Sequence, residues 1–105
     1  MPKNMVKLLL NMILIANAAI PRGGKISVTI EAPETAPKFI ISARGPMLRV
    51  PPKFLELHSG KGPEEAIDAH AVQPYYTLLL ARESGMEIGI HATPEEIVFT
   101  ARRPG

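Results

Sequence analysis

The stretch LLLNMILIANAAIPRGG, Leu8 to Gly24, decides the fold, because it begins as an apolar helix and stops at proline and glycine. Two asparagines interrupt it, Asn11 and Asn17. Polar residues at positions 4, 7 and 11 recur at helical spacing and give the helix one narrow polar strip. The pattern predicts a core helix over residues 3–20, which Pro21 and the two following glycines end.

The same stretch also has the outline of a secretion signal. Lys3 and Lys7 would form its basic start, residues 8–15 its apolar centre and residues 16–18 its cleavage site. Against this interpretation, Asn11 puts an unpaired polar group in the apolar centre, and the run falls short of the about 20 residues of a membrane span. The core helix is preferred, and a small secreted domain behind a cleaved signal stays as the alternative.

The composition predicts one globular domain over residues 1–105, with 46% hydrophobic and 21% charged residues. A net charge of +2 and scattered basic residues, of which only Arg102 and Arg103 are adjacent, argue against a nucleic-acid partner. The chain has no cysteine, which excludes disulfides, thiolate zinc sites and cysteine nucleophiles. We expect a cytoplasmic protein that binds neither nucleic acid nor membrane.

Four segments alternate apolar and polar residues and predict strands that pair as two hairpins, at 25–32 with 38–45 and at 86–92 with 95–102. Short helices are predicted at 51–57 and 63–70, and a longer helix at 71–85 that Gly85 ends. This order predicts an α+β fold, a two-layer sandwich with helices on one face of a mostly antiparallel sheet of about four strands.

Three histidines are the obvious candidates for chemistry, His58, His70 and His91. No two of them have the spacing of metal ligands, and none has a serine or acid placed as in a catalytic triad. We therefore expect surface or packing histidines, with no catalytic residue and no metal site.

Two carboxylate pairs and one glycine-containing loop are weaker candidates. The pairs at 64–65 and 95–96 each follow a proline, where acidic residues are typical of solvated caps. The loop HSGKGPEE, residues 58–65, has glycines and a lysine but lacks the spacing of a phosphate-binding loop. Neither feature predicts a binding site.

The opening helix resembles the first nucleotide-binding box of the histidine-kinase ATPase (Bergerat) fold, which reads N-x-x-x-N-A-x-K before a Pro/Gly turn and a strand. Asn11 matches the first asparagine, and Pro21 with its glycines matches the turn. However, Ile15 stands where that family has its magnesium-chelating asparagine, and Ala18 where it has a basic residue that contacts phosphate. The resemblance thus implies the frame of the box without its ligands.

The other boxes depart from the family in the same way. Ala43 replaces the aspartate that reads adenine, and Ala71 to Pro74, including Gln73, replace the glycine-rich box that opens the late helix. Such a fold needs a carboxylate for adenine, an oxygen ligand for magnesium and glycines at the phosphates. The resemblance implies an ATPase-like sandwich with no nucleotide, no cofactor and no metal.

Nearly the whole chain is similar to the C-terminal domain of the bacterial histidine phosphotransferases, most specifically over VPPKFLELHSGKGPEEAIDAHAVQPYYTLLLARESG, residues 50–85. In that family a helical hairpin before this domain dimerises and carries the phosphorylated histidine, which passes phosphate between receiver domains of response regulators. No such hairpin precedes Lys3, so we expect the C-terminal domain alone, non-catalytic by itself, docking receivers as a monomer or weak dimer.

The main alternative is an active nucleotide-binding ATPase or kinase fragment, with Asn17 as its metal ligand. Asn17 lies six residues beyond Asn11, which turns it well away from the required face of the helix.

Overall fold

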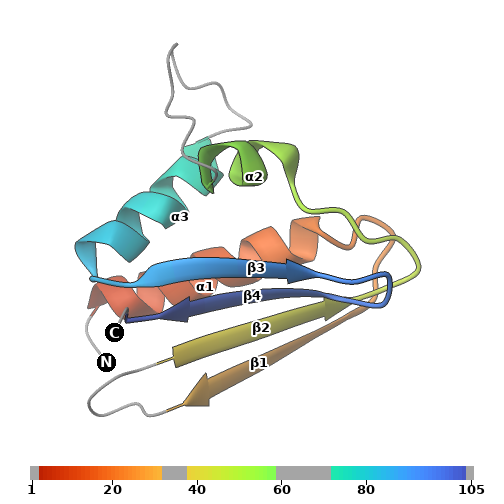
Figure 1. Cartoon of the computed structure of the whole chain (residues 1–105), viewed down its shortest axis with the longest axis horizontal. Helices are drawn as coiled ribbons and strands as arrows, with labels where there is room; N and C mark the ends of the chain where they lie inside the picture. Colours follow the sequence, from red (N-terminus) through yellow and green to blue (C-terminus); the bar gives the residue numbers. More distant parts are fainter. Residues whose placement is uncertain (1–2, 32–37, 59–71, 104–105) are drawn as a thin grey trace.

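The structure is a computed structural model that describes residues 3–31, 38–58 and 72–103 (Figure 1). Each element lies within two residues of its predicted range, and the predicted helix at 63–70 lies outside the described residues. The elements in chain order are α1 (Lys3–Ala18), β1 (Lys25–Glu31), β2 (Lys38–Arg44), α2 (Pro52–His58), α3 (Val72–Glu83), β3 (Glu87–Ala92) and β4 (Ile97–Arg102).

The four strands form one antiparallel sheet in the order β1-β2-β4-β3 (Figure 1). Both predicted hairpins are present, β1 with β2 and β3 with β4. The central pairing joins β2 to β4, with Ile41 opposite Phe99, and brings residues far apart in the sequence into register. The two hairpins therefore share one sheet, whose edge strands are β1 and β3.

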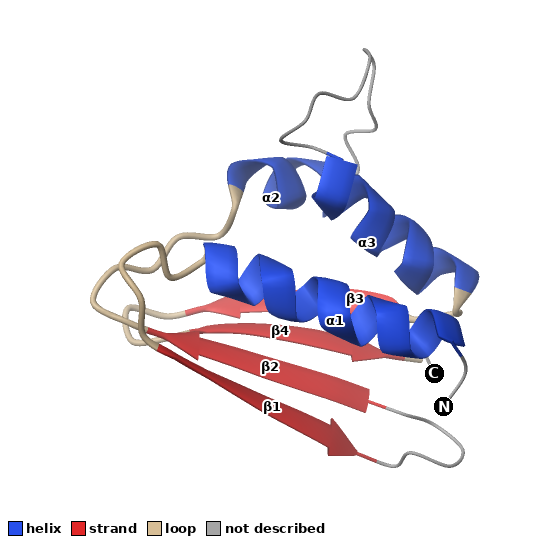
Figure 2. Cartoon of the chain, turned by 180° about the vertical axis from the view of Figure 1, so that it is seen from behind, coloured by secondary structure: helices blue, strands red, loops and turns tan. Residues whose placement is uncertain are grey.

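The helices form a layer on one face of this sheet. Figure 2 shows α1 running along the sheet with α3 beside it. The predicted two-layer α+β sandwich, with helices on one face of a four-stranded antiparallel sheet, is confirmed.

The first helix, α1, is a core element. Its buried residues recur every three or four positions, as an amphipathic helix requires, and are Met5, Leu8, Met12, Ile15 and Ala16. This is the role predicted for a core helix, and it differs from that of a cleaved signal. None of the helices described is long and apolar enough to cross a membrane.

α1 ends at Ala18, two residues before the predicted end, because its last turn tightens. The amide of Ala19 donates to the Ala16 carbonyl (3.0 Å) and that of Ile20 to the Asn17 carbonyl (3.3 Å), a three-residue spacing. Pro21 then has no amide hydrogen to continue the helix.

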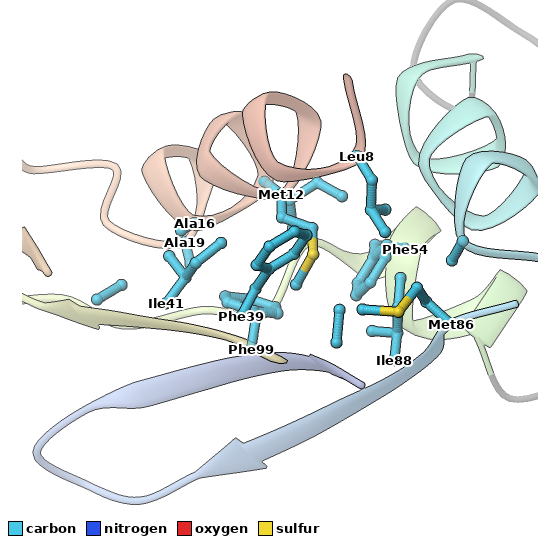
Figure 3. Close-up of a cluster of buried hydrophobic side chains, with 14 of the residues drawn as sticks. Leu8, Met12, Ala16, Ala19, Phe39, Ile41, Phe54, Met86, Ile88 and Phe99 are labelled. Carbon is cyan, nitrogen blue, oxygen red and sulfur yellow. The ribbon is translucent and has the colours of Figure 1, made fainter. Parts of the chain in front are cut away.

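The core lies between the helix layer and the sheet (Figure 3). Phe39 of β2 and Phe99 of β4 are buried beneath α1, and Phe54 of α2 meets Phe99 edge to face, with ring centroids 5.9 Å apart. Each buried phenylalanine contributes roughly 1.5–3 kcal/mol of hydrophobic free energy. The core thus fixes α1 and α2 over the central strands.

Candidate functional site

Two of the positions that resemble the nucleotide-binding boxes, Asn11 on α1 and Gln73 in the first turn of α3, lie in direct contact. The Gln73 side-chain amide (Nε2) donates to the Asn11 side-chain oxygen (3.1 Å) and to the Asn11 carbonyl (3.0 Å). It also lies 2.9 Å from the hydroxyl of Thr77, which is fully buried and donates back to the Gln73 carbonyl at 2.8 Å. This polar contact links α1 to α3, which run side by side in Figure 2.

The contact explains why an apolar helix has a polar residue at Asn11. Its side-chain oxygen accepts from Gln73, and its side-chain nitrogen (Nδ2) donates to the Lys7 carbonyl one turn earlier, at 2.8 Å. Both ends of the amide are therefore satisfied within the protein, as a half-buried polar group requires. The asparagine that the ATPase box would turn toward a ligand here holds two helices together.

Ile15 and Ala43 occupy the other two principal ligand positions, and both belong to the hydrophobic core. Ile15 is 2% exposed on the inner face of α1, and Ala43 is fully buried on β2, where Ile26 and Ile97 are its cross-strand neighbours. Their side chains offer no oxygen or nitrogen to magnesium or adenine. The sequence indicated that these two positions lack ligand side chains. In the structure, both positions hold apolar side chains that pack in the core.

The glycine turn after α1 is in close contact with the backbone at the end of β2. A side chain at Gly24 (φ 147°) would fall within 2.0 Å of the Arg44 carbonyl, and one at Gly45 within 2.4 Å of the Gly23 carbonyl. In a nucleotide site, glycines let the backbone approach a phosphate. Here the missing side chains let two stretches of protein backbone approach each other.

The remaining predicted positions do not join these residues. Ala18 is exposed at the end of α1, and Asn17, the metal ligand of the alternative hypothesis, is exposed away from the Asn11 contact. Ala71, His70 and the loop residues after His58 lie outside the described part of the chain.

His58, at the end of α2, is exposed but contacts two neighbours. Its ring stacks on Phe54 with centroids 6.0 Å apart, and its Nε2 lies 2.7 Å from the carbonyl of Ile88 on β3. His91 is exposed on β3.

Glu96 differs from the solvated cap that the sequence suggested. Its carboxylate accepts hydrogen bonds from the Ser42 hydroxyl (2.8 Å) and the Arg44 guanidinium (3.0 Å), both on β2. The bond from Ser42, then that from Arg44, lower the pKa of Glu96 below its ordinary value, and the nearby charges of Arg44 and His91 act in the same direction. This cluster joins the β3–β4 turn to β2.

One hollow among the described residues, of about 160 Å³, lies at the end of the helix layer opposite the glycine turn, between Met5, Ser84 and Arg103. Ligand pockets usually measure about 300–1,000 Å³. The hollow is too small for a nucleotide and includes none of the ligand positions considered above.

In this two-layer sandwich, protein side chains occupy the positions that resemble nucleotide ligands. Comparison with known proteins identifies the class to which it belongs. The chain belongs to the histidine phosphotransferase C-terminal domain family, which it matches over residues 1–96. Over 101 residues it is 69% identical to the protein phosphotransferase ChpT of Brucella abortus, an alignment that covers 96% of this chain and 48% of ChpT. A solved structure of a bacterial phosphotransferase matches with a TM-score of 0.92 and 69% identity, over 96% of this chain and 49% of that one.

The family expected from the sequence is therefore confirmed, as is the likeness to a ChpT-type protein phosphotransferase. The chain spans about half the length of these two relatives.

Proposed function

We propose that this domain serves a phosphorelay as a docking module for the receiver domains of response regulators, works in the cytoplasm and binds no ATP. The observation that carries the proposal is the closed contact among Asn11, Gln73 and Thr77, together with the packed side chains of Ile15 and Ala43. In a phosphorelay the phosphoryl group passes from one protein to another, so a relay domain has no need of a nucleotide.

At each position that lacks a ligand side chain, the surrounding structure favours the proposal. A carboxylate at position 43 would be buried without a partner, and magnesium would face the isoleucine at position 15. Binding ATP would require the Asn11–Gln73 contact to open and α3 to separate from α1. Side chains that would bind a nucleotide in a kinase domain here stabilise the contact between two helices.

An exposed apolar stripe on α3 offers a surface for a receiver domain. Four residues at helical spacing line it, Val72, Tyr75, Tyr76 and Leu79, each between 36% and 54% exposed. Tyrosines exposed on a rigid helix are typical of protein–protein contacts, since they bring large contact area at small entropic cost. The Asn11–Gln73 contact holds this helix in place, which links the closed nucleotide site to the proposed docking surface.

The test is a titration of the isotope-labelled domain with a receiver domain, followed by NMR. We expect saturable shifts on the α3 stripe and roughly tenfold weaker binding by the Y75A/Y76A variant, since buried tyrosines often dominate an interface. The control is L14A on a different helix, α1, where Leu14 is 57% exposed. Absence of binding by the folded domain, or equal loss in the control, would contradict the proposal.

A further inference from the structure

β1 is an edge strand that the helix layer covers only at Ile26, which packs against the core. Val28 and Ile30 lie opposite the core residues Ile41 and Phe39 in the β1–β2 ladder, so they face the helices. Each nevertheless remains 42% exposed, whereas Ile41 and Phe39 are fully buried. Figure 2 shows the reason, since α1 lies over the middle of the sheet and β1 runs outside it.

The opposite edge of the sheet is protected. On β3, Ile88 is buried, and His58 of α2 bonds its carbonyl at 2.7 Å. Among residues 3–31, 38–58 and 72–103, no hydrogen bond outside the ladder with β2 reaches β1. An uncovered edge with exposed valine and isoleucine is a template for another strand.

The sequence of β1 is complementary to itself. It reads Lys-Ile-Ser-Val-Thr-Ile-Glu from Lys25 to Glu31. In an antiparallel pair of two such strands centred on Val28, the lysine at each position 25 faces the glutamate at position 31 of the other copy. Ile26 then faces Ile30, and Ser27 faces Thr29. Directly opposite residues share one face of a sheet, so all of these pairs match in polarity or charge.

We propose that a second copy of this chain pairs with β1, so that two four-stranded sheets join edge to edge as one continuous sheet. A two-fold axis through Val28 perpendicular to the sheet keeps both helix layers on the same face. The isoleucines of the two copies then cover each other, and both terminal charges of each strand find partners. One strand pair makes a small interface, so the dimer is weak.

Charge reversal tests this pairing. The variants K25E and E31K each place like charges opposite one another at both ends of the strand pair, and the double variant K25E/E31K restores opposite charges. Controls with the same change of net charge are K3E on α1 and E83K on α3, both at exposed positions. Self-association is measured by sedimentation up to millimolar concentration, with thermal unfolding to verify that each variant folds.

We expect each single reversal to weaken dimerisation roughly five- to fiftyfold, and the double variant to return near the original affinity. In a mixture of differently labelled copies, methyl contacts between Ile26 and Ile30 of the other copy should appear. A chain that stays monomeric, reversals no stronger than their controls, or concentration-dependent NMR shifts that avoid β1 would overturn the proposal. Shifts of β1 only when a receiver domain is added would assign this edge to the receiver and overturn it as well.

Discussion

Asn11 and Ile15 lie one turn apart on α1, at two positions where the histidine-kinase ATPase box has asparagines, and their environments differ. Asn11 keeps its amide and bonds to Gln73 and Lys7. Ile15 is apolar and is buried over the sheet. A polar group can remain without its ligand if the protein supplies another partner, whereas a position facing the core becomes part of the core. The two residues show two ways in which a position that resembles the ATPase box is occupied by contacts within the protein.

The largest expected effect on stability is that of A43D. This variant places a carboxylate where the histidine-kinase ATPase fold has the aspartate that reads adenine. Ala43 is fully buried, so the charged group would lose its hydration with no partner. We expect roughly 3 kcal/mol or more of lost unfolding free energy in urea, or a chain that does not fold. A92D, at an exposed alanine of β3, is the matched control and should change stability little.

The next largest effect is expected for I15N, which introduces the metal-binding asparagine of the histidine-kinase ATPase box. The amide would enter the core beneath α1, and the loss of the isoleucine side chain would leave a cavity. We expect a loss of about 2–4 kcal/mol in urea unfolding and no gain of nucleotide binding.

The control for I15N is L14N on the same helix, where Leu14 is 57% exposed. Its cost should stay within about 1 kcal/mol, mainly from helix propensity. Equal losses in the two variants would mean that position 15 is not packed as described.

The polar side of the comparison is tested by Q73A. It removes the hydrogen bonds to Asn11 and Thr77 and leaves the buried threonine hydroxyl with one partner fewer. We expect a loss of about 1–2 kcal/mol in urea unfolding. In a double-mutant cycle with N11A, a coupling energy of about 0.5–2 kcal/mol should appear, and additive effects would contradict the contact.

The smallest expected effect concerns Glu96. Because Ser42 and Arg44 bond its carboxylate, its pKa is lower in the folded chain than in the unfolded one, where it is near 4.5. Its contribution to stability is thus present above that value and lost as the pH falls through the folded pKa. The difference in unfolding midpoint between the original chain and E96Q should therefore hold at neutral pH and shrink below about pH 4.5.

The sequence predicted the elements well, because alternation and helical spacing are local signals. Pro21 and its glycines indicated the end of α1 within two residues. The central pairing of β2 with β4 was not predicted, since it joins segments more than 50 residues apart and leaves no local trace. No local pattern indicated the link from Glu96 to Ser42, because that link depends on the same pairing.

The candidate site was predicted from positions whose side chains cannot bind a nucleotide or a metal. Ile15 and Ala43 stood out because neither side chain can coordinate anything, and their burial follows from where they stand in the frame of the fold. The contact between Asn11 and Gln73 could not be predicted, because it depends on how closely α3 lies against α1. The one available signal for this contact was that two amide side chains, Asn11 and Gln73, stand at positions that resemble separate boxes.

The most direct test of the account is an NMR titration of the labelled chain with magnesium and ATP at millimolar concentration. The account predicts that amides from Asn11 to Gly24 and from Val72 to Tyr76 stay unchanged, since Ile15, Ala43 and Gln73 already occupy the space and the hydrogen bonds. Saturable shifts of those amides that require magnesium would contradict it, and would assign the chain to the nucleotide-binding proteins.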